Sequence, residues 1–265
     1  MPEPWHQPTV GFEFITDTIS VSREFQETHL GACGIDPSTF ADQVDPAFFI
    51  GIGIRAGVNS GISAEGNVNM LQHLIQHRPA ILDEALTVRG IITDVVPVPR
   101  GLRVTTDVWF EDASHARVLS TPRISLKPDP NATARGAGER PPPAIEDIET
   151  AAVLDRHQLT PDQVVGYSSE GNSIHYDMQA ANKAGFRAPI IGGGMGVHYL
   201  NAALWRVCPP NSFEMGIYFR RPIFWDDAFT VVCSGKPGDI TTWSAMGLVR
   251  DGKTLTETSL SLLPG

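Results

Sequence analysis

Short runs of β-branched and aromatic residues, with partial alternation of apolar and polar positions, recur along both halves of the chain. Gly, Pro and Asp bound these runs, which is typical of antiparallel strands joined by turns. The pair Asp251-Gly252 is a strong signal for a hairpin turn. The predicted strands cover residues 86–95, 102–110, 117–121, 229–233, 241–249 and 254–260.

Each half also carries one predicted helix ahead of its strands. Between Gly193 and Trp205 the apolar side chains lie on or near one helical face; they are Met195, Val197, Tyr199, Leu200 and Leu204. A shorter helix is expected over 177–184, with Asp177 as its N-cap. The glycines of 51–57 do not have dinucleotide-binding spacing, and we interpret this stretch as a loop or buried turn. A helix on an antiparallel sheet in each half defines an α+β fold class.

An internal repeat indicates that the two halves are duplicated domains. Residues 78–88 and 221–231 align without a gap, with six identical positions, and their offset is 143 (221 minus 78). A period of this size indicates duplication of a whole domain. A Pro- and Gly-rich stretch lies between the halves and is interpreted as a linker. The predicted domains are 1–127 and 151–265, with a linker at 128–150.

Composition narrows the class of partner. A net charge of −10 argues against a nucleic-acid backbone or an anionic membrane surface as the main partner. No apolar run is long enough to span a membrane, and the N-terminus lacks signal-peptide character, so we expect a cytoplasmic protein. The three cysteines contain no CxxC pair, and His73 and His77 have no third ligand nearby, so we expect no metal.

Candidate chemistry is concentrated in residues 167–195. Glu170, Asn172 and His175 fall within six positions, and a triple glycine, Gly192 to Gly194, opens the next predicted helix. An acid and an imidazole can hold one water and manage its protons. Backbone N–H groups at a helix start suit a developing negative charge. In such loops an Asn can either orient catalytic groups or only cap a turn.

The stretch resembles the signature of the MaoC-like (R)-specific enoyl-CoA hydratases, which runs Ser-Gly-Asp-x-Asn-Pro-Ile/Leu-His and continues to Ala-Gly-Phe, Pro-Ile and Gly-Met. The matching positions are Ser168, Asn172, Ile174, His175, Ala184-Gly185-Phe186, Pro189-Ile190 and Gly194-Met195. The Arg-Pro-x-x-x-Asp start of both repeat copies also resembles this family. The resemblance implies two fused hotdog domains with a non-catalytic first half.

The same resemblance implies an activity, namely reversible addition of water to a trans-2-enoyl thioester to give an (R)-3-hydroxyacyl thioester. It assigns catalysis to Glu170 and His175 with Asn172 as orienter, and oxyanion binding to Gly192, Gly193 and Gly194. The substrate is then a coenzyme A or carrier-protein thioester, with no further cofactor. Lys183, Arg187, Arg220 and Arg221 are candidates to meet coenzyme A phosphates, and a homodimer is one expected assembly.

This chain departs from the pattern at the acid. Glu170 stands where the family has Asp, Ser169 where it has Gly, and Ser173 where it has Pro. Two alternatives therefore stay open, namely a hotdog thioesterase and a degenerate subunit that binds acyl thioesters. His29 and His198 are expected to be structural, although His198 lies one turn past the glycines and could line the pocket.

Overall fold

The protein is described by a computed structural model that covers residues 5–129, 131–132, 141–168 and 172–263. Within these ranges one sheet of eleven strands runs in the order β1-β3-β4-β5-β2-β8-β11-β10-β9-β7, and β6 pairs with β2 and β4. The first-half strands are β1 (Asp17–Ile19), β2 (Val68–Gln76), β3 (Leu86–Val98), β4 (Gly101–Glu111), β5 (Arg117–Ser120) and β6 (Arg123–Pro128). The second-half strands are β7 (Ala152–Gln158), β8 (Phe213–Phe219), β9 (Ala228–Cys233), β10 (Ala245–Arg250) and β11 (Lys253–Leu262).

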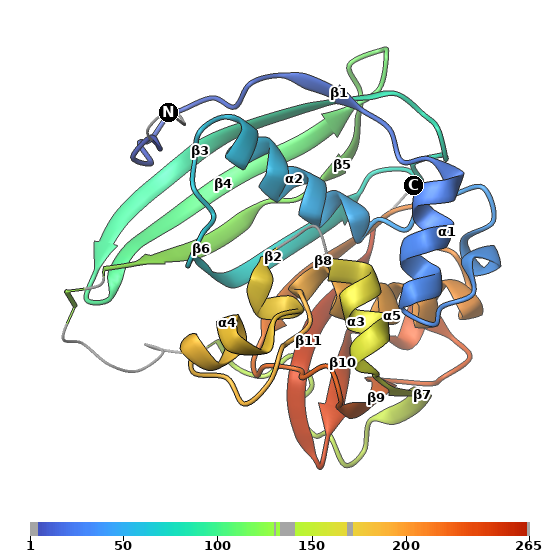
Figure 1. Cartoon of the computed structure of the whole chain (residues 1–265). Coiled ribbons are helices and arrows are strands. Elements are labelled where there is room, and N and C mark those ends of the chain that lie inside the picture. The colour runs from blue at the N-terminus through green and yellow to red at the C-terminus, as the bar shows by residue number, and fades with distance from the viewer. Residues whose placement is uncertain (1–4, 130, 133–140, 169–171, 264–265) are drawn as a thin grey trace.

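Two longer helices cover one face of this sheet, and Figure 1 shows α2 lying across the first half of the sheet and α5 behind α3 in the second. The helices are α1 (Arg23–Ala32), α2 (Phe48–Asn59), α3 (Pro161–Ser168), α4 (Met178–Lys183) and α5 (Gly193–Val207). Short 3₁₀ turns are η1 (Pro37–Phe40), η2 (Ser173–His175) and η3 (Ile240–Thr242). The predicted α+β class is confirmed.

The two halves of the sheet meet edge to edge. β2 pairs antiparallel with β8, with Gln72 opposite Ile217 and Gln76 opposite Phe213. The two halves therefore share one continuous sheet, and neither half presents this edge to solvent.

The two copies of the repeat occupy equivalent places. Each copy begins in the loop after the β2 or β8 strand and ends inside β3 or β9. In the first loop the N–H of Ile81 donates to the Glu84 carboxylate, and in the second the N–H of Phe224 donates to Asp227. Isolated β-bridges then join Gln43 to Ile81 and Ile190 to Phe224. The repeat thus encodes a loop geometry that the halves share.

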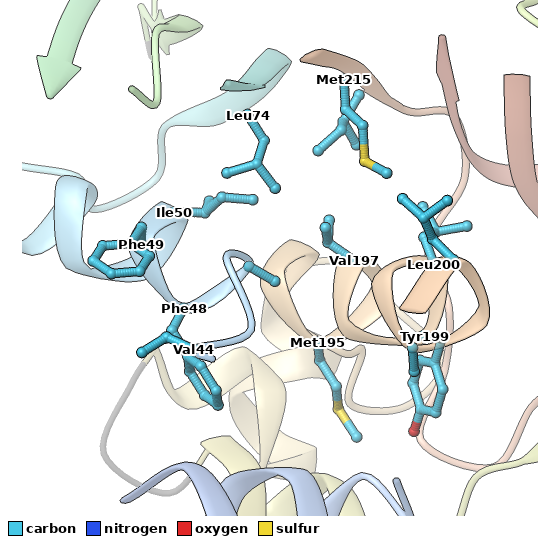
Figure 2. Packing of buried hydrophobic residues seen from close by; sticks show 14 of the residues in the cluster. Val44, Phe48, Phe49, Ile50, Leu74, Met195, Val197, Tyr199, Leu200 and Met215 are labelled. Carbon is cyan, nitrogen blue, oxygen red and sulfur yellow. The ribbon is translucent and has the colours of Figure 1, made fainter. Parts of the chain in front are cut away.

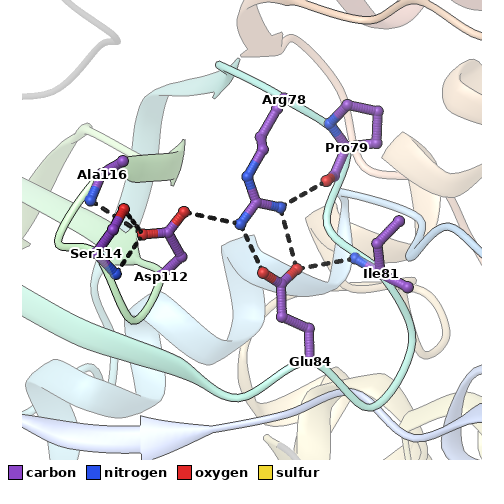
Figure 3. A network of polar contacts seen from close by, with 7 residues as sticks. All are labelled: Arg78, Pro79, Ile81, Glu84, Asp112, Ser114 and Ala116. Atoms are coloured by element: carbon purple, nitrogen blue, oxygen red, sulfur yellow. Dashed lines mark hydrogen bonds and ion pairs between the residues drawn. The ribbon is translucent and has the colours of Figure 1, made fainter.

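The arginine of the first repeat copy, Arg78, joins two neighbouring loops by hydrogen bonds (Figure 3). Arg78 donates to both carboxylate oxygens of Glu84, at 2.6 and 3.1 Å, and to Asp112 at 3.1 Å. Asp112 also accepts from Ser114 and from the N–H of Ala116 in the turn between β4 and β5. These hydrogen bonds lower the pKa of Asp112 well below its ordinary range. The network fixes the β2–β3 loop against the neighbouring turn.

Two predictions about local structure were wrong. Residues 241 and 242 lie in η3 rather than in a strand, because the Asp239 side chain caps the N–H of Thr241 and closes a tight turn, and β10 begins only at Ala245. Residues 51–57 belong to α2 rather than to a loop. Gly53 faces the sheet, where an added Cβ would lie 2.7 Å from Thr121 Oγ1, so glycine here serves close helix packing.

One continuous apolar core lies between the helices and the sheet. Figure 2 shows Leu74 of β2 and Met215 of β8 pointing toward Ile50 of α2 and Val197 of α5. Leu74 and Met215 are opposite each other in the β2–β8 pair and both are fully buried. The core therefore crosses the junction between the halves, and residues from both halves support the start of α5.

Candidate active site

The site is built around the first turn of α5. This helix begins at Gly193 with Gly192 as N-cap, and no side chain caps it among the described residues. The first N–H groups of a helix lack intrahelical partners and carry the positive end of its dipole. An added Cβ on Gly193 would lie 2.7 Å from the ring of Phe219, so glycine is required where β8 supports the helix start. The geometry therefore offers backbone donors to a negatively charged oxygen.

His175 faces this helix start from η2. Its Nδ1 lies 2.8 Å from the carbonyl oxygen of Ile190, and because a carbonyl can only accept, Nδ1 carries the proton of the neutral ring. Nε2 is then an acceptor without a hydrogen-bond partner among the described residues, and an added Cβ on Gly192 would lie 3.7 Å from it. Burial lowers the pKa of His175 below its ordinary 6.5, so the imidazole is neutral at pH 7.

The repeat loop explains how His175 is held in place. Ile190 accepts from His175 and also forms the β-bridge to Phe224, whose own N–H is fixed by Asp227. The Asp227 carboxylate is in turn paired with Arg187 and Arg250. The second repeat copy is therefore connected to the imidazole through three consecutive contacts.

The structure describes Asn172, one of the predicted site residues, but not Glu170. The side chain of Asn172 accepts from the N–H of Ile174 and caps η2, so in this structure the amide shapes the turn that carries His175. Glu170, the predicted acid, lies outside the described residues together with Ser169. Asp177 caps α4 by accepting from the N–H of Ala180, which confirms the prediction made for it.

A buried relay of polar side chains reaches the same helix start. The hydroxyl of Tyr167 lies 2.9 Å from His198 Nε2, and His198 Nδ1 lies 2.7 Å from the carboxylate of Asp45. Asn201 donates to the other oxygen of Asp45 at 2.6 Å. An added Cβ on Gly194 would lie 3.5 Å from the Tyr167 hydroxyl, so the relay ends beside the glycines.

Sequence reasoning identified only one member of this relay. The position of His198 one turn past the glycines was the available signal. Asp45 gave none, because it belongs to the other half of the chain and is fully buried at the start of α2. Burial, with a smaller effect from the nearby negative charge of Asp45, raises the pKa of Tyr167 well above its usual value, so its hydroxyl stays protonated.

The two halves differ at this helix start. The bridges Gln43–Ile81 and Ile190–Phe224 make Asp45 the counterpart of Gly192. In the first half Pro46 has no N–H, and the Asp45 carboxylate accepts from the N–H of Ala47. The Asp45 carboxylate thus binds an N–H just ahead of α2, whereas Gly192 has no side chain that could do the same ahead of α5. In the part of the chain that the structure describes, neither helix has a side-chain cap at its N-cap residue.

The basic residues proposed for coenzyme A lie in varied settings. Lys183 is exposed at the last position of α4. Arg187 is bound to Asp226 and Asp227 and stacks over Phe224, with its guanidinium carbon 4.0 Å from the ring centroid. Arg221 is exposed and donates to the carbonyl of Thr254. Arg220 pairs with Glu257.

His73 and His77, the pair with metal-ligand spacing, have separate partners. His73 lies 3.3 Å from Glu214 and His77 lies 3.2 Å from Ser120. In the described ranges no group of three or more His, Cys, Asp or Glu side chains could hold a metal ion. The three cysteines are free thiols. No helix in those ranges is both long and apolar enough to cross a lipid bilayer.

Comparison with known proteins shows the fold. By sequence, no family model and no curated protein matches the chain. By structure, it is similar to HtdX from Mycobacterium tuberculosis, with a TM-score of 0.74 and 18% identity over 94% of this chain and 100% of that one. It is also similar to a MaoC-like dehydratase from Phytophthora capsici, with a TM-score of 0.65 and 18% identity over 95% and 96% of the chains.

Two further similarities define the architecture and its breadth. A protein from Mycobacterium tuberculosis described as a double hotdog matches with a TM-score of 0.59 and 13% identity, over 96% of both chains. A protein described as an oleoyl thioesterase from Lactobacillus plantarum matches with a TM-score of 0.58 and 10% identity, over 96% and 98% of the chains. The chain therefore has the double-hotdog fold of the MaoC-like dehydratases, as the sequence predicted. A protein described as a thioesterase shares this fold.

Proposed function

We propose that the protein is a hydratase or dehydratase that adds water reversibly to a trans-2-enoyl thioester and gives a 3-hydroxyacyl thioester. The observation that carries this proposal is the open Nε2 of His175 at the uncapped glycine start of α5. A proton acceptor and backbone donors at one place are what addition of water to an enoyl thioester requires.

The residues divide the reaction between them. His175 Nε2 accepts a proton from water while the hydroxyl oxygen forms its bond to C3 of the acyl chain. The electron pair of the C2–C3 double bond moves onto the thioester oxygen, and the N–H groups of Gly193 and Gly194 stabilise that enolate. A proton then goes to C2, and Glu170 is the proposed partner that shares the water and the protons with His175.

The tautomer of His175 favours this division of roles. A ring that donates through Nδ1 to Ile190 has only Nε2 left to receive a proton. The Asp45 carboxylate, which takes the place of Gly192 ahead of α2 and binds the N–H of Ala47, supports one site per chain, in the second half. The thioester as substrate without a further cofactor, the cytoplasmic location and the homodimer remain parts of the proposal.

The test is hydration of a panel of enoyl-CoA thioesters, followed by loss of the enoyl absorbance and by chiral analysis of the product. His175→Gln should lower turnover about 100-fold or more, on the scale of lost general acid–base help. The matched control is His115→Asn, because His115 lies in the exposed β4–β5 turn at a positive φ that Asn tolerates. Equal activity in the two variants would contradict the proposal.

The thioesterase alternative is favoured by one observation, the shared fold with an oleoyl thioesterase. A thioesterase would release a free thiol from a saturated acyl-CoA, which a hydratase cannot do. Thiol release that equals or exceeds hydration would replace the proposed activity. Thioester binding without either reaction would favour the binding-subunit alternative.

A further inference from the structure

A cavity in the first half lies beneath α2, outside the site at α5. Its walls include the apolar side chains Ile50 and Ile54 of α2 and Val104 and Val108 of β4. On the sheet face that forms its floor, Val104 and Val108 alternate with Thr106 along β4. The floor also carries further polar side chains, although this face of the sheet is turned toward the helix; they are Gln72, Thr121, Arg123 and Ser125. Polar groups that were buried against a purely apolar acyl chain would lose their hydrogen bonds to water, so this floor indicates a ligand that is partly polar.

Arg123 is the unusual group in this cavity. Burial lowers its pKa to about 10, yet at pH 7 the guanidinium is still charged. In the part of the chain that the structure describes, no hydrogen bond or ion pair joins its side chain to another residue. By its exposure Arg123 is partly buried where it lines the cavity, and a guanidinium that is partly removed from water and has no protein partner is available to bind an anion.

The Lys and Arg side chains that line this cavity have no acidic counterpart among its described lining residues. Lys127 lines the same cavity, and none of the described lining residues is Asp or Glu, although the whole chain carries a net charge of −10. The buried hydroxyl of Thr121 lines the cavity as well and has no hydrogen-bond partner. A cation with a free hydroxyl and no competing acid is the environment of an anion site.

The register of the sheet places this cavity beside the candidate active site. Arg123 is opposite Gln72, which is opposite Ile217, so these residues form one row across β6, β2 and β8. Side chains in such a row share a face, and two strand spacings are roughly 10 Å. Phe219, two residues further along β8 on that face, contacts the start of α5 at Gly193 and lies roughly 7 Å from Ile217 along the strand.

We infer that the first-half cavity binds a carboxylate at the far end of the acyl group, so that the substrates are thioesters of short dicarboxylic acids. This inference rests on the proposed function, because it takes the thioester to lie at the start of α5. An acyl chain extended from there along the sheet face passes the apolar walls and brings its terminal carboxylate to Arg123. Arg123 and Thr121 together supply the hydrogen bonds, with the planar guanidinium matched to the planar carboxylate.

The test uses saturated thioesters, which cannot be hydrated, so binding is measured apart from catalysis. Calorimetric titration compares adipyl-CoA with hexanoyl-CoA, which has the same chain length but lacks the carboxylate. The protein should bind adipyl-CoA on the order of 10- to 100-fold more tightly, the scale of charge-assisted hydrogen bonds. Free adipate and inorganic phosphate serve as arms that detect a general anion site; they should bind far more weakly than the thioester.

Variants assign the preference to the cavity. Arg123→Met should abolish the preference for adipyl-CoA and leave binding of hexanoyl-CoA unchanged, and Thr121→Val should reduce the preference several-fold. Arg156→Met is the matched control, because Arg156 is exposed on β7 in the other half. Because Arg123→Met removes an unpaired charge, its thermal midpoint should equal or exceed that of the parent.

The inference would be overturned by equal affinity for the two thioesters, by a preference that survives Arg123→Met, or by no binding of either. Phosphate binding as tight as that of adipyl-CoA would instead assign the cavity to a free anion and would also overturn it. A clear preference without hydration of any enoyl thioester would contradict only the proposed function, so the two failures are distinguishable.

Discussion

At the scale of single residues, the protonation state of His175 controls the proposed chemistry. The imidazole must be neutral to accept a proton at Nε2, and its partly buried position favours the neutral form. The carbonyl of Ile190 acts in the opposite direction, because it stabilises the protonated ring, but burial has the larger effect. The base is therefore available at and below pH 7.

The pH dependence follows with a definite sign. Because burial lowers the pKa of folded His175 from its ordinary value, the acid limb of kcat/KM should lie at a lower pH than that of an ordinary imidazole, and kcat/KM should fall only as the pH passes through this lowered pKa. A pH profile of kcat/KM for an enoyl thioester measures this. An acid limb that begins well above pH 6.5 would contradict the assigned environment of the imidazole.

The Tyr167 hydroxyl is proposed to position the start of α5. Tyr167→Phe leaves Nε2 of buried His198 without its donor, which should lower the free energy of unfolding by about 1–3 kcal/mol. Turnover should fall roughly 10-fold with little change in KM, because a small misplacement of catalytic groups affects the transition state most. Urea unfolding and steady-state kinetics test both effects.

The control for this substitution is Tyr218→Phe, since the ring of Tyr218 lies in β8 with Arg220 stacked on it. That variant should keep parental stability and kinetics. Parental turnover in Tyr167→Phe would show that the relay only fills space.

At the scale of elements, α2 owes its position to glycines that face the sheet. Gly51 and Gly53 lie in the same helix but point different ways. Gly51 is exposed, with no atom near the position of an added Cβ, whereas Gly53 is packed against Thr121 and Val108. Gly51→Ala should stabilise the protein by about 0.5–1 kcal/mol through helix propensity. Gly53→Ala should destabilise it by about 1–3 kcal/mol through overpacking.

Thermal and urea unfolding of the two variants measure this contrast. A stabilising Gly53→Ala would mean that α2 does not approach the sheet as closely as the structure has it.

The elements also show how far sequence reasoning reached. Strands with alternating β-branched residues, such as β3 and β4, were predicted because their local pattern agrees with their burial. The spacing of apolar residues also predicted α5, although this helix is buried on all sides from Met195 to Trp205. β2, β7 and β8 were not predicted, and α2 was mistaken for a loop because its glycines carry a packing signal rather than a local one. The predicted domain limits and linker stay predictions.

Some residues of the candidate site were likewise predicted from the sequence, and others were not. His175 and the glycines were found because they lie within one short segment that carries a motif. Asp45 and Arg123 were not, because their importance arises from the pairing of β2 with β8 and from burial in the first half. Contacts between residues more than a hundred positions apart leave no pattern in a single sequence.

At the scale of the whole molecule, the duplication has made two unequal halves. The first half has Asp45 ahead of α2 and a cavity under this helix that contains Arg123, and the second half has glycines and His175 at the start of α5. The shared core and the β2–β8 pair join these features into one unit. On this account the first half binds the acyl group and the second half performs the chemistry.

The most direct test of this account is the fate of oxygen from the solvent. The protein is incubated with an enoyl-CoA in ¹⁸O-labelled water, and the products are analysed by mass spectrometry. The account predicts an intact thioester with one heavy oxygen on C3 of the acyl chain, and loss of this product in His175→Gln. Heavy oxygen in the carboxylate of a free acid, or no incorporation at all, would contradict it.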